Sequence, residues 1–553
     1  MKTCLSNSHE SSPKLVPIRA LLIFAVILGA CSRTPVADQE PVSELSSSKI
    51  DWYEGDVESA FAYAESAGKP LFLYWGAEWC PPCHYLKNKI FTRQGFVTRM
   101  QDFVPVYLDG DTARAQILAE TLEVKGYPTV IIFNAMGQEV MRMPSTVPVD
   151  QYEAVLDAAV SSMKPVKTVL TEVMAAGPES ASPADLNLLA FYSWGQDSRV
   201  DLSTEDQVSA FRRLYHETPM DLEVERSRFL GLYLAALARQ AHQSESTDPP
   251  LTAEEGAAAQ EAILEVLADP TLRNANLLWV DYYADSIIDL LQPDDTPDRH
   301  VLLGAWYRAA NAMEEDDALS VDDRLAATVL KIGLVKMSAH PDADDVQIPA
   351  SLQHHVRSRT AWALETVTEE SELQTVVNTL AYMLEDAGLS DEAESMLLSK
   401  MHDTAAPYYF MSWLAGLKAD AGDTEAALEW YRKAYDSSEG RYSRFRWGSS
   451  YLRQLMELSP TSVERIEADS IEVLSELLTF DDAFAGGNHA RLDSLQSAYW
   501  GWNGDESHDE VLAGIRDHVH ASCARYPAAG DDSQRQRCES FMVPEEIQGK
   551  AAM

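Results

Sequence analysis

Two cysteines separated by two residues are the part of this sequence best suited to chemistry. The motif Trp79–Cys83 reads WCPPC and follows the apolar run 71–75. A strand that leads into a helix beginning at the first cysteine places the sulfur of Cys80 at a helix N-terminus, where unpaired N–H groups and the helix dipole favour a thiolate over a thiol. Because the thiolate is the species that attacks disulfides, the spacing predicts that Cys80 and Cys83 form a redox-active pair.

A structural zinc site is the alternative use of such a pair. It would require a second pair of Cys or His ligands at suitable spacing. Only His84 lies close to the motif, and no second pair is evident. We therefore expect neither a metal nor another cofactor. The six cysteines of the chain are Cys4, Cys31, Cys80, Cys83, Cys523 and Cys538.

The segment downstream of the motif has the elements that would position it. Residues 103–108 are predicted to form a strand and residues 112–124 a helix. A second strand is predicted at 128–133, and the turn 134–137 leads into a further extended run at 138–142. This alternation of strands and helices is typical of an α/β domain.

Residues 50–163 resemble thioredoxin, on the WCPPC motif and on the turn GYPT at 126–129. In that family the proline matching Pro128 is cis and lies against the active-site disulfide, and the backbone of the preceding residue, here Tyr127, pairs with a bound substrate chain. An ordinary proline at the start of a strand is the alternative for Pro128 alone. Residues 109–111 resemble the variant seen in the periplasmic thioredoxin-like domain of transmembrane thiol:disulfide interchange proteins.

One departure from the thioredoxin pattern concerns proton transfer. Thioredoxin carries a buried aspartate six positions before the first cysteine, where it assists proton transfer from the second cysteine. This chain has Tyr74 at that position. A tyrosine with an ordinary pKa of about 10 is a poor base at neutral pH. We expect Tyr74 to be a core aromatic, so that water takes the proton, or Glu78 if the fold brings it close.

The residues between and beside the cysteines suggest how the pair is tuned. Pro81 and Pro82 fit the first helical turn, but neither has an N–H to donate to a thiolate, so Cys80 depends mainly on the N–H of Cys83. Because the thiolate is less stabilised, we expect the Cys80–Cys83 pair to reduce or isomerise disulfides. Cys80 is expected to be the exposed nucleophile and Cys83 the buried resolving thiol. Trp79 is expected to form a hydrophobic contact surface beside the sulfur.

His84, directly after the second cysteine, has two possible roles. It is expected to be a partly exposed helix residue without a function, as histidines on helix surfaces often are. Electrostatic tuning of the cysteine pair is the alternative.

The N-terminus indicates export. Residues 1–30 are interpreted as a lipoprotein signal peptide, because basic residues precede an apolar run at 20–28 that is about half of the ~20 residues needed to span a bilayer. The sequence LGAC at 28–31 resembles the bacterial lipobox, which implies lipidation of Cys31. An ordinary secretory signal with an incidental Cys31 is the alternative.

The residues after Cys31 refine the expected location. Ser32, in place of an aspartate, implies the outer membrane rather than the inner one under enterobacterial-type sorting. The polar stretch 31–49 is interpreted as a flexible tether. We therefore expect a periplasm-facing lipoprotein of the bacterial cell envelope, held at a membrane by its N-terminal lipid.

Charge excludes one class of partner. Lys and Arg number 44 against 87 Asp and Glu, a formal net charge of −43. Such a field repels nucleic acid and anionic lipid surfaces, so no nucleic-acid partner is expected and a solvated acidic surface is the default explanation. The length of 553 residues is far more than a thioredoxin domain needs.

Residues 164–553 are predicted to be one extended α-helical region, with loops at the breaks 248–250, 293–297 and 341–345. An internal repeat is clearest at 375–435, and its period of 34 residues (422 minus 388) resembles the tetratricopeptide repeat. Such an array typically offers a concave surface for protein segments, and a mere spacer is the alternative. The first copy has Leu380, Ala381, Gly388, Ala393 and Leu397, matched by Leu414, Ala415, Gly422, Ala427 and Tyr431.

The last two cysteines are close in sequence. Cys523 and Cys538 flank a polar loop, and in an oxidising compartment they are expected to form a structural disulfide worth up to about 3 kcal/mol. A redox relay with Cys80 is the alternative.

The sequence thus predicts an α/β thioredoxin fold followed by an all-α, tetratricopeptide-like helical region. The predicted function is a membrane-anchored, extracytoplasmic thiol-disulfide oxidoreductase. Its partners would be client proteins with thiols or disulfides and an unidentified redox partner protein. A protein-binding scaffold with incidental redox chemistry is the alternative class, and the presence of Cys80, Cys83 and Pro128 favours the enzyme.

Overall fold

The computed structural model describes residues 49–143, 151–197, 200–244, 250–338, 346–526 and 533–543. The predicted signal peptide, the lipidated Cys31 and the tether up to residue 48 lie outside these ranges, as do most of the predicted loops at 248–250 and 341–345. A search of the described helices for a long apolar segment able to cross a lipid bilayer finds none.

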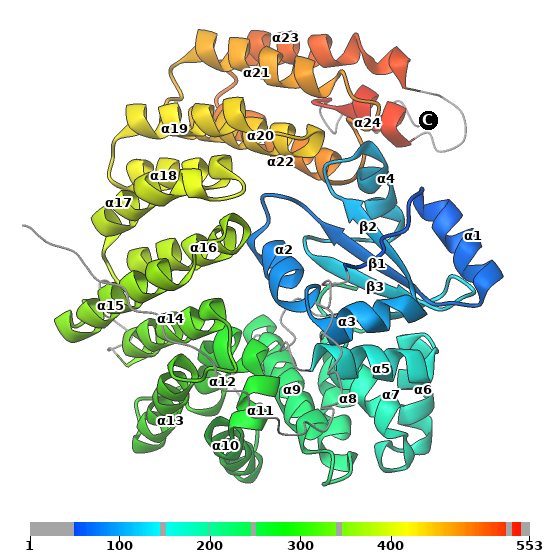
Figure 1. The fold of residues 1–553 in the computed structure, drawn as a ribbon. Helices are drawn as coiled ribbons and strands as arrows, with labels where there is room; N and C mark the ends of the chain where they lie inside the picture. Colours follow the sequence, from blue (N-terminus) through cyan, green and yellow to red (C-terminus); the bar gives the residue numbers. More distant parts are fainter. Residues whose placement is uncertain are drawn as a thin grey trace, which may run out of the picture. The chain divides into compact units, whose positions relative to one another are not determined.

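Four strands form one mixed sheet in the order β2-β1-β3-β4 (Figure 1). Strand β1 is parallel to β2 and antiparallel to β3, and β3 is antiparallel to β4. Every residue of the central strand β1 is buried, which explains why its sequence is continuously apolar rather than alternating. The strands are β1 (Leu71–Gly76), β2 (Val104–Asp109), β3 (Thr129–Phe133) and β4 (Glu139–Met143).

Helices flank the sheet and connect its strands. Asp56 begins the first of them by accepting a hydrogen bond from the backbone N–H of Ser59 at 2.7 Å, and Gly68 ends it in a left-handed conformation with φ of 64°. The helix predicted at 112–124 is shorter, because Leu122 already leaves the helical conformation. These helices are α1 (Val57–Ala67), α2 (Pro81–Tyr85), α3 (Gln94–Arg99), α4 (Ala113–Thr121) and α5 (Tyr152–Ser162).

In the described residues after 163, all regular elements are helices. The main ones are α6 (Val166–Ala176), α7 (Pro183–Ala190), α8 (Thr204–Glu217), α9 (Glu223–Gln243), α10 (Ala253–Ala268), α11 (Pro270–Ala275), α12 (Ala284–Leu291), α13 (Pro297–Glu314), α14 (Val321–Met337), α15 (Ala350–Thr366), α16 (Glu370–Asp386), α17 (Ser390–Lys400), α18 (Pro407–Asp420), α19 (Thr424–Ser437), α20 (Arg441–Leu458), α21 (Val463–Leu477), α22 (Gly486–Trp502), α23 (Asp509–His520) and α24 (Ser533–Ser540).

The segment with the internal repeat folds into two successive helix pairs, α16 with α17 and α18 with α19. The turn of each pair contains a glycine in a left-handed conformation, with φ of 72° at Gly388 and 77° at Gly422. A residue with a Cβ atom is strained in that conformation, which explains why glycine recurs at both turns.

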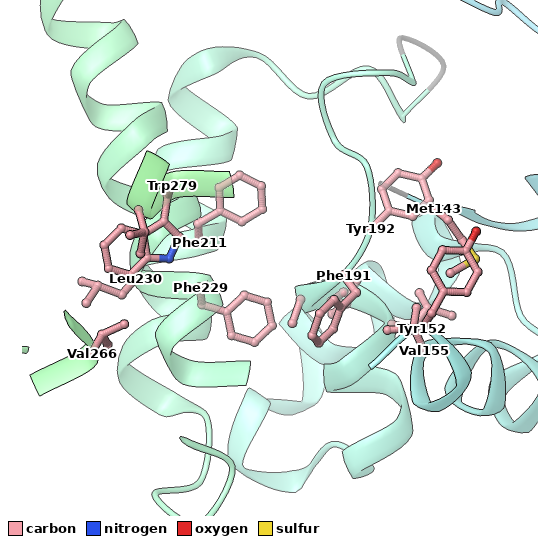
Figure 2. Packing of buried hydrophobic residues seen from close by; sticks show 14 of the residues in the cluster. Met143, Tyr152, Val155, Phe191, Tyr192, Phe211, Phe229, Leu230, Val266 and Trp279 are labelled. Carbon is pink, nitrogen blue, oxygen red and sulfur yellow. The ribbon is translucent and has the colours of Figure 1, made fainter. Parts of the chain in front are cut away.

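The sheet and the first helices of the helical region share one hydrophobic core. Figure 2 shows Met143 of β4 and Tyr152 of α5 on one side, Phe191 after α7 between them and the next helices, and Phe211 and Phe229 of α8 and α9 on the other. All five side chains are buried in the same cluster. The thioredoxin-like portion therefore does not stand apart from the helices that follow it.

Candidate active site

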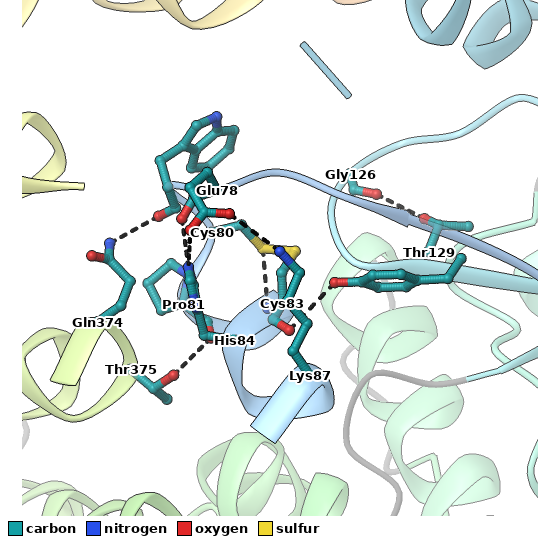
Figure 3. Close-up of a disulfide and its surroundings, with 12 residues drawn as sticks. Glu78, Cys80, Pro81, Cys83, His84, Lys87, Gly126, Thr129, Gln374 and Thr375 are labelled. Atoms are coloured by element: carbon teal, nitrogen blue, oxygen red, sulfur yellow. Dashed lines mark hydrogen bonds and ion pairs between the residues drawn. A yellow bond between two sulfur atoms is a disulfide. The ribbon is translucent and has the colours of Figure 1, made fainter. Parts of the chain in front are cut away.

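The cysteine motif begins helix α2, as the sequence predicts. Cys80 is the N-cap residue in an extended conformation, and Pro81 and Pro82 occupy the first helical positions. The sulfurs of Cys80 and Cys83 are joined in a disulfide, with the Cα atoms 5.2 Å apart (Figure 3). The backbone N–H of Cys83 donates to the sulfur of Cys80 at 3.2 Å. The N–H of Cys83 is the donor that the sequence predicts for this sulfur, since Pro81 and Pro82 have no N–H.

The turn before β3 has the conformation typical of a thioredoxin active site. The peptide bond between Tyr127 and Pro128 is cis. Thr129, the next residue, pairs with Trp75 near the end of β1, the strand that leads to the cysteine motif. Its hydroxyl donates to the carbonyl of Gly126 at 2.7 Å, which closes the turn. The cis proline is therefore held at the end of the sheet where the motif begins.

Tyr74 is a buried core aromatic, as expected. Its hydroxyl donates to the carbonyl oxygen of Cys83 at 3.3 Å, and its ring packs against Phe91 with centroids 4.9 Å apart. Burial raises the pKa of Tyr74 well above its ordinary value, so the phenol stays protonated at neutral pH. The alternative proton acceptor, Glu78, is exposed and forms an ion pair with Lys87 at 3.2 Å.

The expected partial exposure of His84 is wrong. The residue is only 1% exposed, and its Nε2 lies 2.5 Å from the carbonyl oxygen of Glu78. Because a carbonyl can only accept, Nε2 carries the proton and Nδ1 is the lone-pair nitrogen, which is buried and has no hydrogen-bond partner among the described residues. Burial lowers the pKa of His84, which keeps the ring neutral at pH 7.

The expected exposure of Cys80 is also wrong. Cys80 is 1% exposed, and Cys83, expected to be buried, is 0% exposed. The physical reason is that helices from the second half of the chain pack over the motif. One hydrophobic cluster contains both cysteines and Trp79 together with Ala406, Tyr408 and Trp447 of the helical region.

Two polar side chains of helix α16 bind the backbone of the motif (Figure 3). The amide nitrogen of Gln374 donates to the carbonyl of Trp79 at 3.0 Å, and the hydroxyl of Thr375 donates to the carbonyl of Pro81 at 2.8 Å. The amide oxygen of Gln374 accepts from the N–H of Ala406 at 3.0 Å, just before α18. These bonds attach α16 and the start of α18 to the motif.

Aromatic and cationic side chains complete this contact around the ring of Trp79. Tyr409 of α18 stacks on it with centroids 6.4 Å apart, and Trp447 of α20 meets it edge-on at 5.5 Å. The guanidinium of Arg446 lies 4.2 Å from the ring centroid, and burial lowers the pKa of this arginine. The ring of Trp79 is therefore covered by side chains of the same chain, and its expected role as a contact surface for other proteins stays a prediction.

Asp111, on the loop after β2, binds the N-terminus of α20. Its carboxylate accepts from the backbone N–H of Ser443 at 2.6 Å and from the hydroxyl of Ser443 at 2.9 Å. Gly440 is the N-cap residue of α20 and has no side chain to fill this role. Asp111 thus acts as a helix cap supplied from the thioredoxin-like portion. Burial raises its pKa to about 6.

The residues that cover the motif were not identified from the sequence. The one local signal is the pair Gln374 and Thr375, which interrupts the otherwise apolar run 373–377 on a helix. Polar side chains on a buried face are hydrogen-bonded, so such a pair predicts polar partners on a neighbouring element. The sequence does not reveal that these partners are carbonyl groups of the cysteine motif.

Cys523 and Cys538 lie at the other end of the helical region. Their sulfurs are joined in a disulfide with Cα atoms 5.5 Å apart, which connects the turn Cys523–Arg525 to α24. Both residues are buried. Across the described ranges, no group of three or more His, Cys, Asp or Glu side chains is placed to hold a metal ion.

Fold and site together define a thioredoxin-like domain, and residues 57–160 match the family model of that description. The prediction of a thioredoxin fold followed by a helical region is confirmed.

Individual relatives match the same part of the chain. It is similar to the thiol:disulfide interchange protein DsbD of Yersinia enterocolitica, with 31% identity over 81 residues, or 14% of each chain. The protein of that name from Salmonella typhimurium is 32% identical over 80 residues, again 14% of each chain. The one from Vibrio vulnificus is 29% identical over 109 residues, or 19% of this chain and 18% of the relative.

This chain thus spans less than a fifth of the length of these relatives. Among solved structures, a DsbH oxidoreductase is 18% identical and covers 22% of this chain and 93% of its own, with a TM-score of 0.20.

Proposed function

We propose that this protein is an extracytoplasmic thiol-disulfide oxidoreductase that acts on client proteins through Cys80 and Cys83. The observation that carries the proposal is the arrangement of the motif: a disulfide at the start of α2, with the N–H of Cys83 on the sulfur of Cys80 and the turn 126–129 at the end of the sheet where the motif begins. The similarity to proteins named thiol:disulfide interchange protein supports it.

The reaction is two successive thiol-disulfide exchanges. In the reduced protein, the thiolate of Cys80 attacks one sulfur of a client disulfide, forms a mixed disulfide and releases the other client sulfur as a thiolate, which takes up a proton. The thiolate of Cys83 then attacks the sulfur of Cys80, which closes the Cys80–Cys83 disulfide and releases the second client thiol. Two electrons pass from the dithiol to the client, and a redox partner protein with a dithiol returns them.

The reduction potential of the Cys80–Cys83 disulfide depends on which N–H groups donate hydrogen bonds to its sulfurs. Pro81 and Pro82 carry no N–H, and within the described part of the chain the N–H that bonds to the sulfur of Cys80 is that of Cys83. The reduced form is therefore weakly stabilised, which favours a reducing or isomerising role over a strongly oxidising one. Equilibration of the protein with glutathione buffers measures the potential, and a value near about −120 mV would contradict this assignment.

The location and partners of the protein are part of the same proposal. The signal peptide at 1–30, lipidation at Cys31 and the tether at 31–49 would hold the protein at the outer membrane of a bacterial envelope, facing the periplasm. The tetratricopeptide-like helices, clearest at 375–435, would select the clients. The disulfide between Cys523 and Cys538 would have a structural role.

A second function has a specific observation in its favour. If the protein is a binding scaffold with incidental redox chemistry, a buried cysteine pair is expected, and both sulfurs are covered by the helical region. A buried disulfide in an oxidising compartment stabilises a fold without any turnover.

Reduction of insulin distinguishes the two functions. The full-length protein, supplied with dithiothreitol, should accelerate insulin reduction, and Cys80→Ser should lose at least about 100-fold of that rate because the nucleophile is gone. Cys523→Ser serves as the matched control, since it removes a cysteine of the other disulfide, and should keep the activity. Equal rates for wild type and Cys80→Ser would contradict the enzyme.

Client identity can be addressed with the same motif. In Cys83→Ala, the resolving thiol is absent, so the mixed disulfide at Cys80 persists. Mass spectrometry of the trapped complexes would identify the clients, and Cys80→Ser/Cys83→Ala should trap none.

A further inference from the structure

We propose that helices α16, α18 and α20 form a movable cover over the cysteine pair, and that clients and the redox partner reach Cys80 only when this cover moves away. The inference rests on the proposed function. The cover consists of these three helices and their contacts with residues 79–81, 111 and 127.

Access to the cysteine pair is blocked in the described arrangement. Thiol-disulfide exchange requires a sulfur of the attacking molecule to reach the sulfur of Cys80, and its rate depends on that access. Cys80 is 1% exposed and Cys83 is 0% exposed, inside a cluster with Ala406, Tyr408 and Trp447. A polypeptide cannot approach a sulfur enclosed in this way. The arrangement is therefore a closed state for the proposed reaction.

The cover occupies the surface that a client would need. In a thioredoxin-like domain, a substrate chain lies on the surface around the tryptophan and the residue before the cis proline. Here Tyr409 and Trp447 pack against Trp79, and Tyr442 packs against Tyr127 with centroids 6.3 Å apart. Side chains of the protein itself therefore fill the place of the client.

The contacts of the cover include polar groups that water can replace. Gln374 and Thr375 each donate to a motif carbonyl, and Ser443 bonds to the carboxylate of Asp111. The neutral hydrogen bonds of Gln374 and Thr375 each contribute about 1 kcal/mol net, because the separated groups bond to water instead. The cover also has apolar contacts around Trp79, so these hydrogen bonds are the part of the interface that separates at little cost.

One glycine sets the approach of α20 to the thioredoxin-like portion. Gly440 has φ of 89° and ψ of 147°, a region that residues with a side chain avoid. A Cβ atom at this position would also lie 2.6 Å from Cγ of Asp111. Alanine at 440 would therefore push the start of α20 away from the thioredoxin-like portion without touching the cysteine motif.

The test measures how fast the Cys80–Cys83 disulfide of the full-length protein is reduced by dithiothreitol. Samples are quenched with iodoacetamide, and the alkylated peptides are quantified by mass spectrometry. If the cover opens and closes faster than the reagent reacts, the rate is proportional to the fraction of open molecules. The Cys523–Cys538 disulfide reports general unfolding in the same sample, because it lies outside the cover.

Two variants loosen the cover by different routes. Thr375→Val removes the bond to the carbonyl of Pro81 and should raise the rate about fivefold, the effect of one ordinary hydrogen bond. Gly440→Ala should raise it at least about tenfold, because of backbone strain and overlap with Asp111. Reduction of Cys523–Cys538 should not change in either.

A matched control lies one turn along the same helix. Thr379 donates to the carboxylate of Asp322 on α14 at 2.5 Å, so Thr379→Val also removes a hydroxyl bond of α16 but none to the motif. Its motif disulfide should be reduced at a rate within about twofold of the wild type. A change as large as that of Thr375→Val would show that α16 stability in general, and not its bond to the motif, controls access, and would overturn the proposal.

Two further outcomes would overturn the cover. One is an unchanged rate at the motif in both Thr375→Val and Gly440→Ala. The other is a parallel rise at both disulfides, which would mean that access comes from general unfolding. Insulin reduction by Gly440→Ala separates this inference from the proposed function. If the Cys80–Cys83 disulfide is reduced faster but insulin is not turned over, the cover stands and the oxidoreductase function is rejected. If insulin is turned over but the disulfide is reduced at an unchanged rate, the oxidoreductase function stands and the cover is rejected.

Discussion

At the scale of single residues, the chemistry of the motif depends on which groups can donate or accept a proton. Tyr74 replaces the aspartate of thioredoxin, and it donates to the carbonyl of Cys83 while burial raises its pKa. His84 is neutral and buried, with Nε2 committed to the carbonyl of Glu78. Neither side chain replaces the missing carboxylate as a charged base next to Cys83. Water that enters when the cover opens is therefore the proton acceptor most consistent with these contacts.

Asp111 couples the cover to pH. Burial raises its pKa to about 6 in the covered state, above the ordinary value of 3.8 for an aspartate, which we expect Asp111 to approach once α20 has moved away. A higher pKa in the closed state means that protonation favours closure as pH falls through 6. The charged or titratable groups that interact with Asp111 are Asp109, Arg446, Tyr107, Tyr127 and Tyr408. The fraction of open molecules should fall about tenfold between pH 7 and pH 5.

This prediction is measured as the rate of reduction of the Cys80–Cys83 disulfide by a phosphine, divided by the rate for an exposed small disulfide at the same pH. The division removes the pH dependence of the reagent. Asp111→Asn keeps an acceptor for Ser443 but does not titrate, so its ratio should be flat between pH 5 and pH 7. The same tenfold fall in wild type and Asp111→Asn would contradict the assignment to Asp111.

At the scale of elements, Gly231 allows helix α9 to pack against the segment 278–282. A Cβ atom at Gly231 would overlap the indole ring of Trp279, whose Nε1 donates to Asn276 at 2.6 Å. The ring is buried and cannot turn away without losing that bond. Gly231→Ala should therefore destabilise the protein by about 1–3 kcal/mol, despite the better helix propensity of alanine.

Urea unfolding followed by circular dichroism measures this change. Gly256 on the neighbouring helix α10 is the matched control, because a Cβ atom there meets no atom of the described residues within 4 Å. Gly256→Ala should be neutral or stabilising by up to about 1 kcal/mol. Equal stability of the two variants would show that the contact between α9 and Trp279 adapts freely.

The same scale shows what the sequence could predict. The strands near 71–75, 104–108 and 129–133 follow from short apolar runs, and α2 follows from the two prolines of the motif, because these signals are local. The cover is not local. The residues Gln374 and Trp79 are 295 positions apart, and no periodicity indicates which helix face meets which loop. The expected exposures of Cys80 and His84 were wrong for this reason, because they apply to a thioredoxin-like domain without the helices that follow it.

At the scale of the whole molecule, residues 48–553 form one compact unit by their contacts. The shared core explains part of this, since Tyr152 and Phe229 belong to one cluster although they lie on α5 and α9. The cover adds a second connection through α16, α18 and α20. We infer that the first connection is permanent, because it is apolar throughout, and that the second opens, because it combines apolar contacts with hydrogen bonds to the motif that water can replace.

Arg142 of β4 provides a test of the permanent connection. The residue is fully buried, and its guanidinium donates to the carbonyls of Leu122 at 2.8 Å and Gln196 at 2.9 Å. It also forms an ion pair with Glu139 at 3.1 Å. Arg142→Ala leaves these partners buried without their cation and should destabilise the protein by about 3–5 kcal/mol. Arg535→Ala, which removes an exposed ion pair with Glu539, should cost less than about 0.5 kcal/mol.

Hydrogen exchange shows which elements lose protection together. Because β4 and the helices α7 to α9 share one core, Arg142→Ala should speed amide exchange in β3, β4 and α7 to α9 by similar factors. Exchange in α21 and α23, which belong to the other large cluster, should change less. Loss of protection confined to the sheet would mean that the thioredoxin-like portion unfolds alone, and would contradict a permanent connection through the shared core.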